Sequence, residues 1–351
     1  MKPAPEESAV PLAGGGFPLL LYNPALGMPD LLDSSPLEIT DLSKAFRFGL
    51  LGRERRQALA GLSLRMVQGE ILGYLGPNGS GKTTTLKILM GLVSPDTGTA
   101  RILGKPLEDP SWRHRIGFLP EHPYFYDYLT PREYLEYAGR ILGLPPGTRR
   151  ERAEQLLLRL GLQKASGVPM RRFSKGMLQR VGIAQALLND PEMVFLDEPM
   201  SGLDPIGRHM VREVILDLKS RGRTVFFSTH ILPDAEALCD RVALLKAGRL
   251  LKVGPLGEIL DQSFSHFEVL LSGASSAELP ELGAGVRSRQ RLGERWRLEV
   301  EEPALVRVLE AASAARARVL SVQPIRPSLE DFFFAEFGPQ PEGQEPWTLG
   351  D

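Results

Sequence analysis

Residues 76–83 combine glycines, a lysine and a threonine in a spacing that is typical of a phosphate-binding loop. An apolar run at 71–75 precedes them and a helical pattern over 82–92 follows, which is the context that the pattern GxxxxGK[ST] requires. The glycines let backbone N–H groups point at phosphate oxygens, and the helix N-terminus adds partial positive charge. We expect Lys82 to reach the β- and γ-phosphates and the Thr83 hydroxyl to bind Mg²⁺. The segment predicted to hold the nucleotide is Gly76, Pro77, Asn78, Gly79, Ser80, Gly81, Lys82, Thr83 and Thr84.

A second chemical feature is the acid pair Asp197-Glu198, which follows the apolar run at 193–196. An acid at the tip of a buried parallel strand lies at the carboxyl edge of its sheet, where ligands bind in open α/β folds. We expect Asp197 to hold Mg²⁺ and Glu198 to polarise an attacking water as general base. An isolated Asp-Glu pair is as easily a solvated strand end. Its position downstream of a phosphate loop favours the functional interpretation.

The elements around these residues indicate an α/β domain. Short apolar runs at 71–75, 193–196 and 224–227 predict buried strands, and longer helical patterns lie between them. The helices carry start signals: residues 130–133, Thr-Pro-Arg-Glu, form a capping box with proline at the first helical position, and Asp204-Pro205 opens another helix. We predict a disordered extension over 1–35, a nucleotide-binding domain over 36–262, an accessory domain over 263–338 and a flexible tail over 339–351.

The accessory segment predicts a small α+β domain. Its expected strands are 266–271, 285–290, 295–300 and 318–322, in the order strand, helix, strand, strand, helix, strand, helix. A ferredoxin-like arrangement is one candidate for this order. The last helix, 328–337, places Leu329, Phe332, Phe333 and Phe337 on one face, which favours packing in a core.

Composition excludes several classes of protein. The 42 basic and 43 acidic side chains give a net charge of -1, which argues against a dedicated nucleic-acid binder. The one cysteine, Cys239, excludes a disulfide framework. No apolar run reaches the roughly 18 residues of a membrane span, so we expect membrane contact only through a partner.

The segment Phe173-Ser174-Lys175-Gly176-Met177 resembles the LSGGQ signature of ATP-binding-cassette (ABC) ATPases, matching it at Ser174 and Gly176. Lys175 and Met177 depart from the pattern in a way familiar among exporter ATPase subunits. Ser174 is well placed to cap a helix whose N-terminus binds phosphate. The resemblance implies that Ser174, Lys175, Gly176 and Met177 bind the γ-phosphate of ATP held by the other protomer.

The remaining elements of this family follow in order along residues 37–260. Residues 201–204 resemble the D-loop, with Asp204 at the dimer interface, and His230 falls where the switch histidine contacts the γ-phosphate. Glu121 replaces the usual glutamine of the Q-loop, where a carboxylate would approach Mg²⁺ or water. The resemblance places Phe46 against adenine, with Phe48 as a competitor.

The resemblance implies an ABC-type phosphate-loop NTPase with a mixed sheet core and a helical signature subdomain. Two copies would dimerise around two ATP molecules with Mg²⁺ and drive a separate transmembrane permease. The chain would be cytoplasmic and held on the inner face of the cell membrane through that permease. The segment 327–333 also resembles the end of an accessory domain in exporters of drugs, sodium, lipids or polysaccharides. Residues 149–180, with nine basic side chains and two acids, form either a solvated helical face or a contact surface for the permease or lipid headgroups.

The alternative is a soluble ABC ATPase of translation or DNA repair. Translation-type members usually carry two cassettes in one chain, and this chain has one. Repair-type members insert a long coiled coil before the signature, whereas only 91 residues lie between Lys82 and Ser174 here. The transporter interpretation is therefore preferred.

Overall fold

A computed structural model describes residues 35–48, 54–259, 266–273, 285–325 and 328–338. The predicted N-terminal extension, apart from its last residue, lies outside the described residues, as does the predicted tail 339–351. The helix expected between the first two accessory strands falls in 274–284 and also lies outside them.

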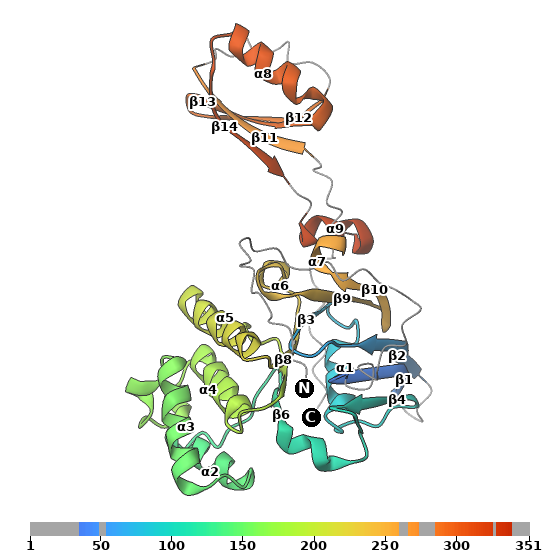
Figure 1. Ribbon diagram of the computed structural model, residues 1–351, viewed down its shortest axis with the longest axis vertical. Helices are drawn as coiled ribbons and strands as arrows, with labels where there is room; N and C mark the ends of the chain where they lie inside the picture. Colours follow the sequence, from blue (N-terminus) through green and yellow to red (C-terminus); the bar gives the residue numbers. More distant parts are fainter. Residues whose placement is uncertain (1–34, 49–53, 260–265, 274–284, 326–327, 339–351) are drawn as a thin grey trace, which may run out of the picture. The chain divides into compact units, whose positions relative to one another are not determined.

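A six-stranded sheet forms the centre of residues 35–259 (Figure 1). Its order is β10-β9-β3-β8-β7-β6, and all neighbours from β9 to β6 run parallel. Every residue of β3, β7 and β8 is buried because both faces of the sheet are covered. The three strands predicted from apolar runs are thereby confirmed. The strands are β3 (Ile71–Leu75), β6 (Ile116–Leu119), β7 (Met193–Asp197), β8 (Thr224–Thr229), β9 (Arg241–Lys246) and β10 (Arg249–Pro255).

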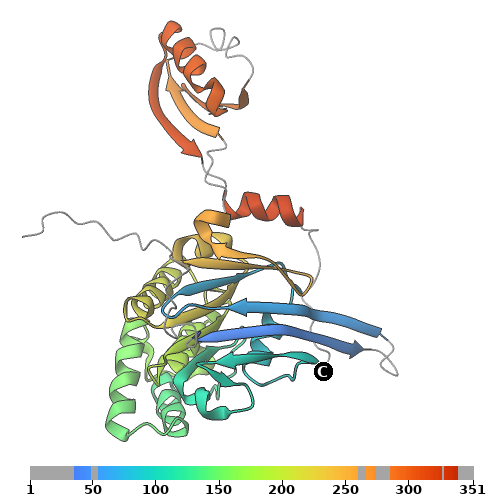
Figure 2. The ribbon, with the colours of Figure 1, turned by 45° about the vertical axis from the view of Figure 1, so that its right-hand side comes forward.

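A second, antiparallel sheet covers one face through α1 (Lys82–Leu89) (Figure 2). Leu86 and Leu89 of α1 share one hydrophobic cluster with Tyr74 and Phe226 of the central sheet and with Leu62 of the antiparallel sheet. This mixture of parallel and antiparallel sheets confirms the predicted fold class. The antiparallel strands are β1 (Leu37–Phe48), β2 (Glu54–Arg65), β4 (Thr97–Ile102) and β5 (Lys105–Pro106).

Helices cover the opposite face of the central sheet. The predicted capping box is present at α2, where the Thr130 and Glu133 side chains each accept a hydrogen bond from the other residue's backbone N–H. In the basic stretch, Arg149 pairs with Glu136 at 2.9 Å, which stabilises the helical subdomain from within. The helices are α2 (Pro131–Ile141), α3 (Pro146–Arg159), α4 (Lys175–Leu187) and α5 (Pro205–Ser220).

Three short helices pack near β9 and β10. They are α6 (Leu232–Leu238), α7 (Leu256–Ile259) and α9 (Leu329–Phe337). Leu329 is fully buried in a cluster with Leu75, Leu232 and Ile259, so α9 packs against the nucleotide-binding part of the chain.

The accessory strands form their own antiparallel sheet, in the order β12-β13-β11-β14. One helix, α8, covers a face of this sheet, and Val308 packs on Val269, Leu298 and Val300 in a separate hydrophobic cluster. Each of the four predicted strands is confirmed with small shifts in its ends. The elements are β11 (His266–Ser272), β12 (Val286–Leu292), β13 (Arg295–Val300), α8 (Leu305–Ala314) and β14 (Arg318–Ile325).

Candidate active site

The carboxyl ends of four adjacent parallel strands bring the predicted chemistry to one edge of the central sheet. The phosphate loop follows β3, and the segments carrying Glu121, Glu198 and His230 follow β6, β7 and β8. Since β3, β8, β7 and β6 are neighbours in this order, residues far apart in the sequence face the same space.

The phosphate loop turns through glycines in the left-handed region of φ. Gly79 has φ 76° and Gly81 has φ 112°, conformations that L side chains rarely adopt. A Cβ on Gly81 would lie 2.6 Å from the Ala58 carbonyl oxygen, so the neighbouring strand also excludes a side chain. α1 begins directly at Lys82, and its N-terminus therefore opens into the loop, where it favours an anion.

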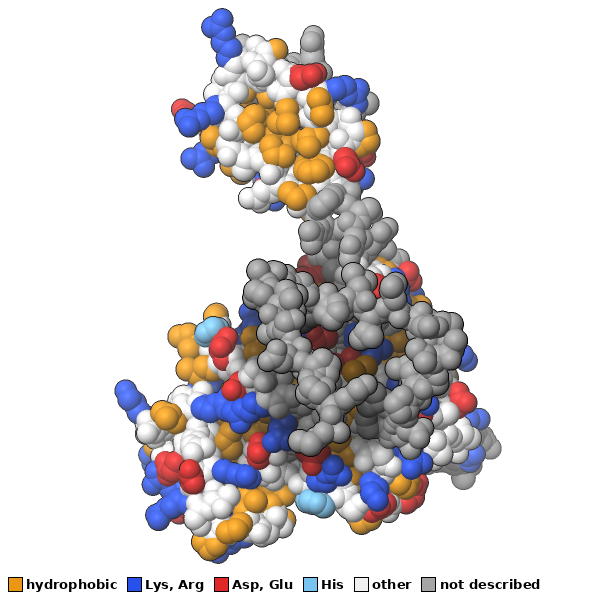
Figure 3. Space-filling model, viewed as in Figure 1, with side chains coloured by type: hydrophobic (Ala, Val, Ile, Leu, Met, Phe, Trp, Pro, Cys, Tyr) orange, Lys and Arg blue, Asp and Glu red, His pale blue; other side chains and the backbone are white. Residues whose placement is uncertain are grey.

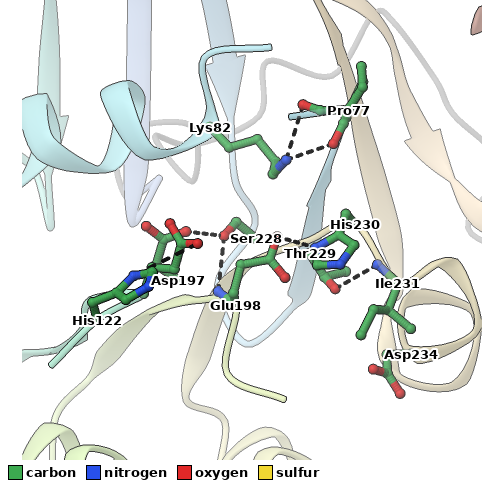
Figure 4. A network of polar contacts seen from close by, with 12 residues as sticks. Pro77, Lys82, His122, Asp197, Glu198, Ser228, Thr229, His230, Ile231 and Asp234 are labelled. Carbon is green, nitrogen blue, oxygen red and sulfur yellow. Dashed lines mark hydrogen bonds and ion pairs between the residues drawn. The ribbon is translucent and has the colours of Figure 1, made fainter. Parts of the chain in front are cut away.

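Lys82 lies inside this loop with its ammonium group held by backbone carbonyls. Its Nζ donates to the oxygens of Gly76 at 2.6 Å and Pro77 at 3.3 Å (Figure 4). Burial lowers the pKa of Lys82, and the negative charges of Glu198, Asp197 and Glu121 oppose that shift. A buried ammonium surrounded by carbonyls and acids is suited to exchange these partners for phosphate oxygens.

Asp197 ends β7 almost fully buried, with 2% of its surface exposed. The Ser228 hydroxyl of β8 donates to its carboxylate. Burial raises the pKa of Asp197 to about 6, with smaller contributions from Glu121 and Glu198 in the same direction, while Ser228 and Lys82 lower it. A second positive charge at this place would favour the ionised carboxylate.

Glu198 and His230 form a hydrogen-bonded pair across the edge of the sheet. His230 Nδ1 lies 2.9 Å from Glu198 Oε1, and the Glu198 side chain is buried whereas that of His230 is half exposed. The hydrogen bond to Glu198 raises the pKa of His230, and partial burial opposes that rise. Glu198 has φ 49°, a left-handed conformation that strains a residue with a side chain. Its N–H donates to the Ser228 carbonyl oxygen at 3.2 Å, which fixes this turn.

Glu121 is partly exposed two residues after β6, and His122 Nδ1 lies 3.9 Å from its Oε1. The charge of Glu121 influences the pKa values of Lys82, Asp197 and His230, so it belongs to the same electrostatic site. The structure thus brings Glu121 together with the phosphate loop, the acid pair and the switch histidine.

The residues present fit a polyphosphate with a divalent cation. The Ser80 hydroxyl is buried in the loop without a hydrogen-bond partner among the described residues, so it has bonding capacity for a ligand. Among the residues that the structure describes, no three His, Cys, Asp or Glu side chains gather closely enough to hold a metal by themselves. A cation here would therefore be coordinated by both protein oxygens and phosphate oxygens. Thr83, partly exposed at the start of α1, could supply its hydroxyl oxygen as one ligand.

The signature segment lies apart from this assembly. Ser174 caps α4 as predicted, its Oγ accepting from the Met177 N–H at 3.2 Å, and its surface is exposed. Within the described part of the chain, no hydrogen bond or ion pair joins Ser174, Lys175, Gly176 or Met177 to residues 76–84. The exposed Asp204 caps α5 by accepting from the Gly207 N–H at 2.7 Å, which confirms the predicted helix start.

Phe46 lies on β1 directly opposite Arg56 of β2. A Cβ on Gly79 would lie 3.1 Å from Arg56 Nη2, so this pair of strands borders the phosphate loop. Lys44 Nζ lies 5.7 Å from the centre of the Phe46 ring. The side chain of the competitor, Phe48, lies outside the described residues.

Two residues at the site escaped the sequence analysis. Ser228 bridges Asp197 and Glu198, since its Oγ also lies 3.2 Å from the Glu198 backbone nitrogen, but only the histidine of its motif signals chemistry. Gln179 of α4 donates to the Glu198 carbonyl oxygen at 3.1 Å and so connects the signature helix to the acid pair. Each of these residues lies beside a motif residue with a more specific chemical signal, and neither Ser nor Gln predicts a role in the site by its type alone.

Comparison with known proteins agrees with this site. Residues 59–201 match the family model described as ABC transporter. The chain is 43% identical over 309 residues to an uncharacterized ABC transporter ATP-binding protein of Synechocystis sp., covering 87% of this chain and 85% of that one. It is 35% identical to a daunorubicin resistance ATP-binding protein of Streptomyces coeruleorubidus, over 80% of this chain and 93% of that one.

A solved structure is similar as well. It is a dimeric ATP-binding cassette in a post-hydrolysis state bound to ADP and Pi, 27% identical, with a TM-score of 0.58, covering 63% of this chain and 98% of that one. The extent and identity of these matches, together with the phosphate loop and the buried acid pair, establish the family. The chain therefore belongs to the ABC transporter family as an ATP-binding subunit that hydrolyses ATP.

Proposed function

We propose that two copies of this chain close around two ATP molecules and that this closure drives a separate membrane permease. One observation carries the proposal: the chain assembles the phosphate loop, acids and histidine at one place, while among the described residues no hydrogen bond or ion pair joins the signature residues 174–177 to the loop residues 76–84. The ATP site of one protomer would then be completed only by the signature segment of a second protomer. Extra phosphate contacts in the closed dimer make ATP shift the population toward closure.

The proposed roles follow from the position of each group. The loop N–H groups and Lys82 bind the phosphates and offset the charge that develops during transfer. Glu198 takes a proton from the attacking water, and His230, held by Glu198, contacts the terminal phosphate. The partner copy supplies Ser174 to Met177, with Asp204 at the interface, and Phe46 stacks on adenine.

We propose Mg²⁺ as the cation, held by Thr83 and Asp197 with Glu121 beside it. When bound, Mg²⁺ would neutralise phosphate charge during transfer. The elevated pKa of Asp197 supports this role, because a buried acid that is costly to ionise alone is well suited to a site completed by a cation.

A surface beside β6, the strand that leads to Glu121, supports a permease contact. A hollow of about 300 Å³ lies between β6 and the helices α2 and α4, and Tyr137 and Ile141 line it. Ile141 is 69% exposed, and Tyr137 of the same helix is 43% exposed. Figure 3 shows hydrophobic side chains gathered over this lower part of the helical subdomain. Exposed apolar groups of this kind indicate a protein contact, and the link through 116–121 leads directly to the nucleotide site.

The permease would be a separate membrane-spanning chain, and this chain would bind to it on the cytoplasmic face of the membrane. None of the helices in the ranges that the structure describes is long and apolar enough to cross a bilayer. The relatives include proteins named for bacitracin transport, Nod factor export and daunorubicin resistance, which supports export. We propose that residues 36–262 form the ATPase domain and 263–338 the accessory domain of such an exporter subunit.

The test is co-purification from membranes with a tag on this chain. We expect a multi-span membrane protein to be recovered, and Ile141→Glu to reduce its yield at least fivefold. The matched control is Val306→Glu on α8, because Val306 is 64% exposed and lies outside the proposed contact. Recovery of no membrane protein, or equal loss in both variants, would contradict the proposed permease contact.

A further inference from the structure

Helix α6 begins two residues after His230 and spans only seven residues. The intervening Ile231 N–H donates to the Thr229 hydroxyl at 3.0 Å, so the switch loop is short and tightly turned. A helix of two turns is not stable on its own in water, and tertiary contacts must hold it. The position of His230 therefore depends on what fixes α6.

One side of α6 is fixed by ion pairs between a buried carboxylate and two partly exposed arginines. The Asp234 carboxylate is 3% exposed and lies 3.0 Å from Arg212 Nη2 and 3.8 Å from Arg208 Nη1. Both arginines belong to α5, which starts at the D-loop. This contact joins the switch helix to the body of the ATPase domain.

The other side of α6 is fixed by the C-terminal helix α9. The Glu236 carboxylate accepts a hydrogen bond from the Leu329 N–H at the start of α9. The Leu329 side chain is fully buried against Leu232 and Ala235 of α6. Lys252 of β10 lies 5.2 Å from the centre of the Phe332 ring, which adds a third contact to α9.

α9 also borders the nucleotide site. A hollow of about 540 Å³ is lined by phosphate-loop residues, including Pro77 and Asn78, by His230 and by Glu330 and Phe333 of α9. α9 therefore lies beside both the phosphate loop and His230, the residue whose position it would influence. The His230 side chain is half exposed and is held by its pair with Glu198, whereas its backbone leads directly into α6. A small movement of α6 would therefore shift the His230 backbone and disturb this pair.

We propose that α9 positions the switch histidine: through Leu329 and Glu236 it holds α6, and thereby the loop that carries His230. This inference rests on the proposed role of His230 in ATP hydrolysis. It gives the segment beyond residue 262 a direct effect on turnover, because anything that draws α9 away from α6 loosens the switch loop.

The experiment compares two buried leucines in the full-length protein. Leu329→Ala removes the contact between α9 and α6, whereas Leu298→Ala removes an equally buried leucine from the accessory core. We expect Leu329→Ala to lower kcat for ATP about tenfold with the ATP Kd within twofold, and Leu298→Ala to change kcat less than twofold. Glu236→Gln, a milder change that keeps the side-chain shape, should lower kcat about threefold and decides the matter if Leu329→Ala fails to fold.

A double-mutant cycle separates positioning of His230 from general destabilisation. If α9 acts through His230, Leu329→Ala in a His230→Ala background lowers single-turnover hydrolysis less than twofold further. An undiminished tenfold loss in that background, or parental kcat in both Leu329→Ala and Glu236→Gln, would overturn the inference. Full activity of His230→Ala alone would instead refute the role given to His230, and the inference with it.

Discussion

The carboxyl edge of the central sheet and the signature segment differ in how complete they are. At the sheet edge, Lys82, Asp197, Glu198 and His230 are connected by hydrogen bonds, ion pairs or mutual charge effects, and three of these side chains are buried. The signature segment is capped and ordered by Ser174, but Ser174 itself is exposed. One region is finished by the chain alone, and the other presents an ordered helix N-terminus to the outside.

This difference shows that a segment can be well ordered and still form only part of a binding site. A helix N-terminus with a serine cap is suited to bind phosphate, yet in the part of the chain that the structure describes no hydrogen bond or ion pair joins it to the phosphate loop. The chain thus carries two unlike halves of an ATP site. The connection between them, from Gln179 to the Glu198 carbonyl, runs inside one protomer and would let each half sense the other.

The largest expected effect is at the finished region. Glu198→Gln removes the base but keeps the size of the side chain, so we expect turnover to fall at least ~100-fold, about 3 kcal/mol of barrier, with ATP affinity within about threefold. Steady-state hydrolysis and nucleotide titration measure the two quantities. Glu192→Gln is the control, since Glu192 precedes the same strand and pairs with Arg115 at 2.7 Å. Normal turnover by Glu198→Gln would contradict the base assignment.

A smaller effect is expected at the signature. Ser174→Arg blocks the helix N-terminus, and we expect hydrolysis to fall about 30-fold while ATP still binds the single chain, because the segment acts on the partner's nucleotide. Lys82→Ala breaks the other half. Mixing the two impaired variants restores one complete site per heterodimer, so activity should rise above that of either variant alone. No rise on mixing would indicate that both halves act within one chain.

The fold was largely predictable because its signals are local. Continuous apolar runs marked β3, β7 and β8, and the Thr130–Glu133 capping box marked the start of α2. The packing of α9 was not predictable in this way. The apolar stripe that includes Leu329 indicates burial, but nothing in the local pattern says that its partner is α6. Leu329 and Leu232 of α6, which lie 97 residues apart in the sequence, are brought together only by tertiary structure.

The candidate site likewise contains residues that the sequence predicts and residues that it does not. Glycines, a lysine and acids at strand ends predict a functional site, because few structural roles require those residue types there. Ser228 does not, since a serine in a buried strand is ordinary until Asp197 is found beside it. The left-handed φ of Glu198 is likewise invisible in the sequence, because it results from the turn that the surrounding strands impose.

The smallest expected effect sharpens the electrostatic side of the comparison. The pKa of Asp197 is raised from 3.8 to about 6 in the folded chain, so the folded state keeps this proton to higher pH than the unfolded state does. Ionising Asp197 therefore costs stability as pH rises through this window, by about 1–3 kcal/mol. Asp197→Asn cannot ionise and should gain that amount over the parent at pH 8 and little at pH 4.

Denaturant unfolding of the nucleotide-free chains at both pH values measures the difference. His230 titrates in both chains, so its contribution largely cancels in the comparison. A gain that is equal at pH 4 and pH 8 would show that Asp197 carries no ionisation cost in the folded chain.

The central claim is that a second copy completes each ATP site. Sedimentation of Glu198→Gln with saturating ATP and Mg²⁺ tests it most directly, because blocked hydrolysis should hold the closed dimer. We predict twice the mass of one chain with nucleotide, the mass of one chain without it, and loss of the dimer when Ser174→Arg is added. A single chain under saturating nucleotide, in solution and in the membrane assembly alike, would contradict the claim.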